Sequence, residues 1–242
     1  MNTILSTIDG SLNDHHSKYF TVTQISLSVV TIISIIIIML ETVQSLGQYS
    51  GFFIITEWVS VIIFSIEYIL RLTVSKKKLS YIFSFWGLID AVSILPTIFS
   101  VINLTFLKVF RDLRILRMLR IVRMGKISRA YLKSHDEVKT QAEFNKINIL
   151  IFFSALLSMI IIFASVLYAF ENAQPEYSNI PISMIQSSKI LIGGLSFTAP
   201  LTLEGQITII IGRFIGLALF GLLIGIIGGV LNQLLFGKIE KH

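Results

Sequence analysis

The sequence contains no cysteine and little charge. None of its 242 residues is Cys, and only 14% are Asp, Glu, Lys or Arg. The missing thiols exclude disulfide bonds, thiol catalysis and thiolate metal sites. With 54% hydrophobic residues and a mean hydropathy of +0.80, the chain is too apolar for a soluble domain of this size. We predict an integral membrane protein, and we do not interpret the net charge of +6 as a nucleic-acid signal.

Five apolar runs are long enough to cross a hydrocarbon core, which takes about 20 residues in a helix. They cover residues 22–44, 51–73, 82–101, 147–170 and 206–236. We expect a further helix at residues 104–126, where regularly spaced bases obscure the hydropathy signal. The fold class that follows is all-α and integral to the membrane, with six transmembrane helices in each subunit.

Basic residues are distributed unevenly over the loops. Lys76, Lys77 and Lys78 follow the second run, several bases follow the fourth helix, and Lys238 and Lys241 follow the last run. The loops at residues 45–50, 99–106 and 171–181 contain neither Lys nor Arg. By the positive-inside rule, both termini of this multi-pass protein are cytoplasmic. An even number of spans agrees with both ends lying on one side of the cell membrane.

The most regular feature is the stretch LKVFRDLRILRMLRIVRMGK at residues 107–126. A base stands at every third position, namely at Lys108, Arg111, Arg114, Arg117, Arg120, Arg123 and Lys126. On an α-helix these bases would follow a slow spiral, whereas on a 3₁₀-helix they would form one straight row. A helix lying on a membrane surface would instead alternate steps of three and four. The strict spacing therefore favours a helix that moves in an electric field.

The energetics suit such a movement. One charge that crosses the full membrane potential gains about 2.3 kcal/mol per 100 mV. If about three charges cross in each of four copies, 100 mV supplies on the order of 28 kcal/mol. That free energy is ample to switch a gate between two conformations.

Acidic residues in the neighbouring spans match these bases. Glu57, Phe64, Glu67 and Arg71 are separated by seven, three and four residues, which keeps them on one helix face. Asp90 lies in the third span. Charges inside a membrane are usually paired, so we interpret Glu57 as an outer partner of the bases, Glu67 and Asp90 as an inner acidic pair, and Phe64 as an apolar plug between them. The alternative is that Glu67 and Arg71 only pair with each other beside a core Phe64.

Four segments together resemble the voltage-sensor domain of the voltage-gated potassium channel family, in a form like its prokaryotic members. They are SIIIIMLETV at the end of the first span, the second-span set, FWGLIDAVSILP in the third span, and the basic repeat. The resemblance implies a cytoplasmic lead at residues 1–19 and a voltage-sensor domain at residues 20–126. It also implies a charge-transfer centre of Phe64, Glu67 and Asp90. The implied gating charges are Arg111, Arg114, Arg117, Arg120, Arg123 and Lys126.

The second half of the chain resembles the pore domain of the same family. Residues 127–146 are polar and favour a linker helix, residues 147–236 would form the two-helix pore domain, and residues 237–242 a short cytoplasmic tail. The stretch at residues 180–207 suits a re-entrant pore helix and a filter loop, because non-helical backbone at membrane depth occurs where it lines a cavity. The resemblance places the selectivity filter at Ile192, Gly193, Gly194, Leu195, Ser196, Phe197 and Thr198.

The filter departs from the family. The sequence IGGLSF replaces the potassium signature TVGYG, and no acid precedes Glu204 in this loop. Lys189 and Arg213 would instead form rings of four bases in a tetramer, and such rings favour anions, with N–H and hydroxyl donors of Gly193, Gly194, Ser196 and Thr198 as further anion ligands. Alternatively, Arg213 pairs with Glu204 or Glu171, and Lys189 extends away from the pore. The sequence leaves potassium, unselective cation and anion conduction open.

The glycine-rich sixth span has two interpretations. Glycines spaced by four residues permit close helix packing, whereas the resemblance makes Gly216 the hinge of a gate. The resemblance as a whole implies the pore-forming subunit of a homotetrameric voltage-gated ion channel. The alternatives are an anion-selective channel, a non-conducting voltage-sensing regulatory subunit and a transporter. We expect no enzymatic activity, cofactor, metal site or nucleic-acid partner; the partners are further copies of the chain, membrane lipids and permeant inorganic ions.

Overall fold

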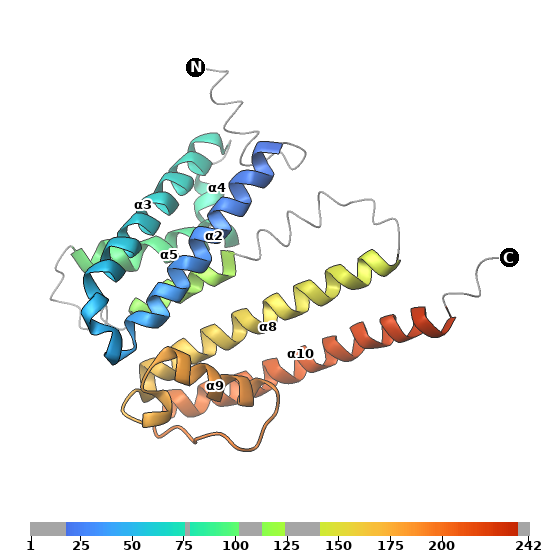
Figure 1. Cartoon of the computed structure of the whole chain (residues 1–242). Coiled ribbons are helices and arrows are strands. Elements are labelled where there is room, and N and C mark those ends of the chain that lie inside the picture. Colours follow the sequence, from blue (N-terminus) through green and yellow to red (C-terminus); the bar gives the residue numbers. More distant parts are fainter. Residues whose placement is uncertain (1–17, 76–77, 102–112, 124–140, 237–242) are drawn as a thin grey trace. The chain divides into compact units, whose positions relative to one another are not determined.

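The structure is a computed structural model of the chain and describes residues 18–75, 78–101, 113–123 and 141–236. Within these ranges the regular structure is helical, as predicted. The chain divides into two compact units, residues 1–134 and residues 135–242. Figure 1 shows the helices of each unit.

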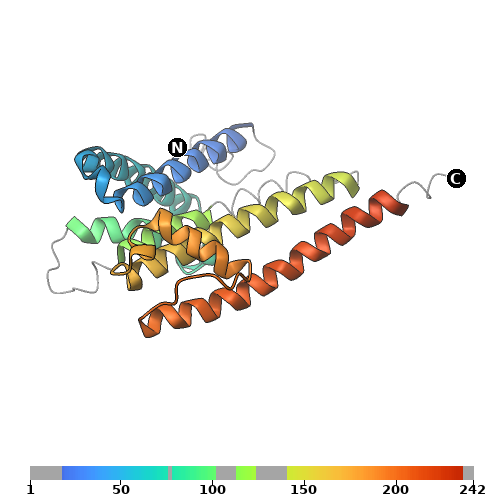
Figure 2. The ribbon, with the colours of Figure 1, turned by 60° about the horizontal axis from the view of Figure 1, so that its bottom comes forward.

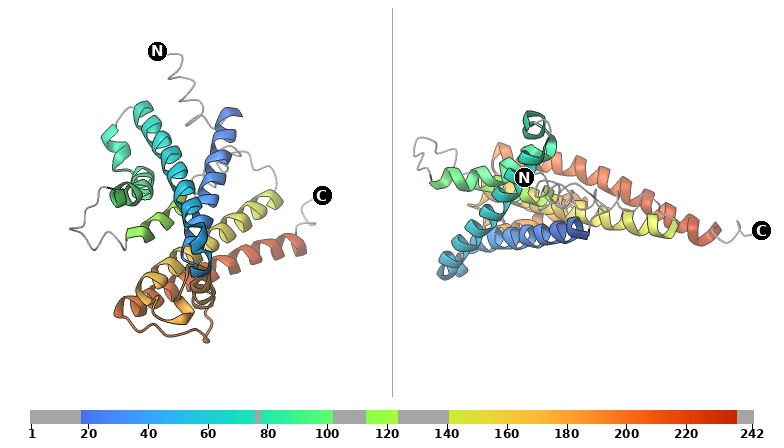
Figure 3. Two further views of the ribbon diagram at one scale, coloured as in Figure 1. Left: turned by 60° about the vertical axis from the view of Figure 1, so that its left-hand side comes forward. Right: turned by 90° about the horizontal axis from the view of Figure 1, so that it is seen from above.

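The first unit begins with two long helices that lie side by side (Figure 3). They are α2 (Lys18–Glu41) and α3 (Ser50–Val74), joined by the short 3₁₀-helix η1 (Gln44–Tyr49). A short helix, α4 (Lys78–Ile82), precedes α5 (Phe85–Val101), and the unit ends with the 3₁₀-helix η2 (Leu113–Arg123). Helix α5 packs on α3, and η2 packs on both α2 and α5. The apolar core between them includes Val61, Phe64 and Ile94.

The basic stripe adopts the 3₁₀ form over its described part. In a 3₁₀-helix, residues three apart eclipse one another, so Arg117, Arg120 and Arg123 stand on one face of η2. Runs of 3₁₀-helix longer than three or four residues are uncommon, and η2 has eleven residues. The sequence left open whether the bases form a spiral or a row, and the structure has the row.

The second unit consists of two long antiparallel helices and a short one packed on both (Figure 2). The long helices are α8 (Gln141–Glu171) and α10 (Leu203–Phe236). Between them lie the 3₁₀-turn η3 (Pro175–Tyr177) and the twelve-residue helix α9 (Ile180–Leu191). Asn179 begins α9 by accepting a hydrogen bond from the Ile182 N–H at 2.9 Å, as an N-cap residue does. The core of this unit contains Leu167, Tyr177, Ile190 and Ile209.

Four segments of the described chain are long and apolar enough to cross a membrane. They are Val22–Glu41, Gln44–Val74, Ile147–Glu171 and Leu203–Asn232. The apolar part of α5, Phe85–Ile98, is shorter, because the run predicted at residues 82–101 is broken between α4 and α5. Helix η2 is basic. The six-span topology therefore stays a prediction.

Several predicted boundaries fall elsewhere or outside the described residues. Helix α2 begins two residues before the predicted sensor domain, and α8 begins at Gln141 and continues through residue 147, so no break marks the predicted end of the linker. The described residues do not include the cytoplasmic lead up to residue 17, linker residues 127–140, the tail, Arg111 or Lys126.

Candidate functional site

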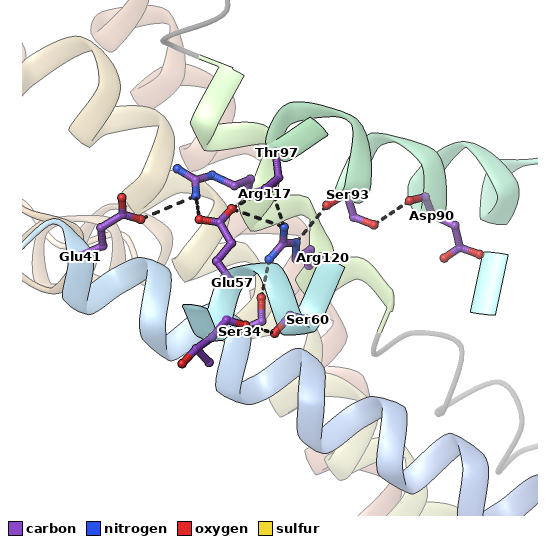
Figure 4. A network of polar contacts seen from close by, with 10 residues as sticks. Ser34, Glu41, Glu57, Ser60, Asp90, Ser93, Thr97, Arg117 and Arg120 are labelled. Atoms are coloured by element: carbon purple, nitrogen blue, oxygen red, sulfur yellow. Dashed lines mark hydrogen bonds and ion pairs between the residues drawn. The ribbon is translucent and has the colours of Figure 1, made fainter. Parts of the chain in front are cut away.

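Arg117 lies at one end of the described row of bases, next to two carboxylates. Its guanidinium group forms an ion pair with Glu57 on α3, and Nη1 lies 3.6 Å from Glu41 Oε2 at the end of α2 (Figure 4). The side chain of Arg117 is 7% exposed and that of Glu41 is 33% exposed. This pair of acids therefore forms a partly open site for a base.

Arg123 occupies a second acidic site at the other end of the row. Its Nε lies 3.2 Å from Asp90 Oδ1, and its Nη1 lies 3.6 Å from Glu67 Oε2. Its Nη2 also donates to the Asp90 carbonyl oxygen at 3.1 Å. Glu67 additionally accepts a hydrogen bond from Arg71 Nε at 2.8 Å. Glu67 therefore contacts both Arg71 and Arg123, whereas the alternative had it paired with Arg71 only. The function of Glu67 and Asp90 as an inner acidic pair stays a prediction.

Phe64 lies beside the two bases nearest the inner acids. It has no exposed surface, and its ring centroid is 4.2 Å from Arg123 Cζ and 5.8 Å from Arg120 Cζ. A cation over an aromatic face is attracted by the ring quadrupole. The ring thus borders the inner acidic site on the side of Arg120. Its role as a plug across which the field drops stays a prediction.

Arg120 stands between the two acidic sites and has no exposed surface. Its Nε donates to the Ser93 carbonyl oxygen at 3.0 Å, Nη1 donates to Ser34 Oγ, and Nη2 donates to Thr97 Oγ1 at 3.3 Å. The nearest carboxylate oxygen in an ion pair with Arg120, Glu57 Oε1, is 3.8 Å from Nη2.

The charges of this network balance. Four guanidinium groups, those of Arg71, Arg117, Arg120 and Arg123, form ion pairs with the carboxylates of Glu41, Glu57, Glu67 and Asp90. Removing one partner of a buried pair costs about 3–5 kcal/mol, because the remaining charge has no compensation. Arg114 lies one step further along η2, and its side chain lies outside the described residues.

In the second unit, the first residues of the predicted filter form the end of helix α9. Gly193 has φ of 81° and donates its N–H to the Ile190 carbonyl at 3.2 Å, while Gly194 N–H donates to the Lys189 carbonyl at 2.7 Å. These two bonds are those of a Schellman motif, which favours glycine at the left-handed position. The expectation that both glycines offer N–H groups to an anion is therefore not met, because these groups already hold the helix end.

The end of the predicted filter, Phe197 and Thr198, is held by contacts with α9 and η3. Thr198 N–H donates to Gln186 Oε1 at 3.3 Å, and its carbonyl accepts a hydrogen bond from the Tyr177 hydroxyl. Burial raises the pKa of Tyr177 to about 12, so the hydroxyl remains a donor at neutral pH. Phe197 packs against the core cluster that contains Tyr177 and Ile190. Leu195 and Ser196, between these anchors, are exposed in the single chain.

Glu171, the last residue of α8, holds the segment that follows the loop. It is 2% exposed and accepts hydrogen bonds from Leu201 N–H at 3.0 Å, Thr202 N–H at 2.8 Å and Gln174 Nε2 at 2.7 Å. The Thr202 hydroxyl is a fourth donor. A Cβ on Gly205 would lie 2.2 Å from Glu171 Oε1, so only glycine fits beside this carboxylate.

The two bases of the second unit have different surroundings. Lys189 is half-buried in the last turn of α9, and Arg213 is exposed on α10, with Cζ 5.0 Å from the Phe197 ring centroid. Within the described ranges, neither base forms an ion pair with Glu171 or Glu204. The alternative of an Arg213 pair with these acids is thus not found, and Arg213 stacks on the filter loop instead.

Gly216 of α10 lies close to the end of α9. A Cβ at this position would lie 2.1 Å from the Leu191 carbonyl oxygen. Close packing therefore accounts for this glycine in the described conformation, and its role as a hinge stays a prediction. The glycines at 221, 225 and 228 have no atom within 4 Å of such a Cβ, so they are open in the single chain.

Comparison with known families decides the class of protein. The sequence profile described as ion transport protein matches residues 19–237, which include all described helices except the first residue of α2. The chain belongs to the ion transport protein family. This family is that of the voltage-gated type of ion channel, so the chain is a multi-pass membrane protein of a channel family and not of an enzyme family. No curated protein matches the chain.

Sequence reasoning missed several residues that this ion transport protein brings to the row of bases. They are Ser34, Glu41, Tyr81, Ser93 and Thr97. Asp90, Ser93 and Thr97 are spaced by three and four residues and therefore share one face of α5. Tyr81 donates to Asp90 Oδ2 at 3.0 Å from the separate helix α4, and no pattern in the sequence signals this contact.

Proposed function

We propose that the chain is the pore-forming subunit of a homotetrameric voltage-gated ion channel in the cell membrane, with cytoplasmic termini. The first unit would act as the voltage sensor and the second as the pore. The observation that carries this proposal is the buried row of Arg117, Arg120 and Arg123, in which each guanidinium group occupies a separate polar site between apolar helices.

The 3₁₀ row makes stepwise movement possible. A shift of η2 by three residues, about 6 Å at 2.0 Å per residue, brings each base to the place of its neighbour. The acceptors on α2, α3 and α5 stay in place, so the next base inherits the same contacts. Arg111 and Arg114 extend the row beyond Arg117 and would supply further steps. Phe64 borders the inner site. Its apolar ring would confine the drop of the membrane electric field to a short distance.

In this proposal, the described conformation is the outward position of the sensor. Arg123 occupies the inner acids, and Arg117 and Arg120 lie further toward the N-terminal end of η2, which is the outer end in the proposed topology. Depolarisation would move the row to this position, and the linker would release the inner ends of α10. Hyperpolarisation would draw Arg120, and then Arg117, toward Glu67 and Asp90.

The filter loop supports a cation as the permeant ion. Within the described residues, the carbonyl groups of residues 192–197 accept no backbone hydrogen bond, whereas the N–H groups of Gly193, Gly194 and Thr198 are occupied. The C-terminal end of α9, where the helix dipole favours positive charge, also meets this loop. Anion conduction through rings of Lys189 and Arg213 is the second candidate, because neither base has an acidic partner in the described structure.

Current recordings on the purified chain in planar bilayers, with KCl asymmetric across the membrane, test this proposal. We expect depolarisation to open the channel and the reversal potential to follow the potassium gradient. A reversal potential that follows chloride would replace the cation by the anion candidate, and Lys189→Gln should then weaken the preference. Voltage-independent currents would contradict voltage gating, and the absence of any current would contradict a pore and leave the non-conducting regulatory subunit as the function.

A further inference from the structure

The site of Arg120 differs in kind from its two neighbours. Arg117 and Arg123 each have two carboxylates within 4 Å. Arg120 instead donates from three different nitrogens to three neutral oxygens: the Ser93 carbonyl, the Ser34 hydroxyl and the Thr97 hydroxyl. Figure 4 shows these groups converging on Arg120 from α2 and α5. The one carboxylate within 4 Å of Arg120, that of Glu57, lies 3.8 Å from Nη2, so the hydrogen bonds of this guanidinium group go to neutral oxygens.

The acceptors are held in place by their own partners. Thr97 Oγ1 donates its hydrogen to Glu57 Oε1 at 2.7 Å, which leaves its lone pairs for Arg120. The Ser93 hydroxyl donates to the Asp90 carbonyl at 2.7 Å. All three acceptor residues are at least 96% buried, so water does not compete for the guanidinium group.

Three acceptors around a plane suit a guanidinium group and not an ammonium group. Arg presents its N–H donors in a fixed planar fork, whereas Lys has one compact point charge on a flexible stem. The sequence of the stripe agrees with this selectivity. Its five central bases, from 111 to 123, are all Arg, and its two Lys stand at the ends, Lys108 and Lys126.

We propose that Ser34, Ser93 and Thr97 form a neutral, guanidinium-selective station between the outer acids, Glu41 and Glu57, and the inner acids, Glu67 and Asp90. Each arginine of the row occupies this station when its neighbours occupy the acidic sites. The station keeps a buried base hydrogen-bonded without adding a third acidic site, whose attraction would trap the row. This inference rests on the proposed voltage sensing, because a station has a function only if the row moves.

A double-mutant cycle on the full-length chain tests the station. The charge that the row of η2 displaces at each voltage is recorded in cell membranes. Its voltage dependence gives the equilibrium constant between the outward position of the row and the position one step further inward. The variants are Ser34→Ala, Arg120→Lys and both together. Ser60→Ala is the matched control, because Ser60 is similarly buried but donates to the Thr56 carbonyl of its own helix.

We expect Arg120→Lys to lower the constant for the outward position about tenfold, which is the effect of one hydrogen bond to a charged group. In the Ser34→Ala background, Arg120→Lys should change it by no more than about threefold, because the fork has already lost an acceptor. In the control cycle, the factors by which Ser60→Ala and Arg120→Lys each change the equilibrium constant should multiply in the double variant, because the two residues do not interact. Independent effects of Ser34→Ala and Arg120→Lys would overturn the station, whereas absence of charge movement in the unmodified chain would overturn voltage sensing itself.

A second variant keeps the test decisive if Arg120→Lys does not reach the membrane. Ser34→Asp places a carboxylate in the station, and we expect the return of charge after a voltage step to slow by about tenfold or more, as for a pair of buried charges. The same return rate as in the unmodified chain would show that Ser34 does not meet the passing bases and would overturn the station.

Discussion

Replacing Asp90 by asparagine is expected to lower the free energy of unfolding of the first unit by about 3–5 kcal/mol. Asp90 is 1% exposed and faces Arg123 Nε at 3.2 Å. Without its charge, Arg123 and Arg71 would share the single carboxylate of Glu67, and one buried guanidinium group would lose its compensation. The loss is large because the Arg123 side chain is only 5% exposed and cannot reach water without unpacking the helices.

Tryptophan fluorescence during denaturant unfolding in detergent measures this effect. Both tryptophans of the chain, Trp58 and Trp86, belong to the first unit, so the signal reports on this unit alone. Glu41→Gln is the matched control, since Glu41 is one-third exposed and an exposed ion pair contributes only about 0–1 kcal/mol. Equal losses for the two variants would contradict a buried acidic site at Asp90.

Replacing Glu171 by glutamine is expected to loosen the segment after the filter loop. The carboxylate accepts four hydrogen bonds, and a glutamine side chain would turn an NH₂ group toward some of these donors. Leaving buried donors unsatisfied costs about 1–3 kcal/mol each. A total near 3 kcal/mol corresponds to amide exchange that is about 100-fold faster, since 1.4 kcal/mol is a factor of ten.

Hydrogen exchange of the Leu201 and Thr202 amides, followed by mass spectrometry in detergent, measures this loosening. Glu176→Gln is the control, because Glu176 is exposed and accepts no hydrogen bond from this segment in the described structure. We expect exchange at these amides to stay within about threefold of the unmodified rate in the control. Unchanged exchange in Glu171→Gln would show that other contacts fix the segment.

The acidic and basic residues of the first unit could be found from sequence because their spacing is regular. The period of three in the stripe, and the steps of seven and three that join Glu57, Phe64 and Glu67, are enough to place these residues on helix faces. The carboxylates then follow from the need to neutralise bases in an apolar segment. The structure brings Arg117, Arg120 and Arg123 to these residues.

The neutral contacts could not be found in this way. Ser34, Ser93 and Thr97 are common in apolar helices, where a hydroxyl usually bonds to its own helix, as those of Thr31 and Ser60 do. Spacing also did not decide between α- and 3₁₀-helix, because both forms accept the same residues. The Schellman motif at Gly193 and Gly194 was not predicted, because the sequence analysis assigned both glycines to the filter.

The charge that moves in response to voltage steps, recorded with impermeant ions on both sides, tests the central claim most directly. The account predicts a charge that saturates with voltage and that falls by up to about one elementary charge per subunit in Arg117→Gln, with no fall in Lys78→Gln, whose base is exposed and lies outside the row. No voltage-driven charge, or the same charge in Arg117→Gln as in the unmodified chain, would contradict it.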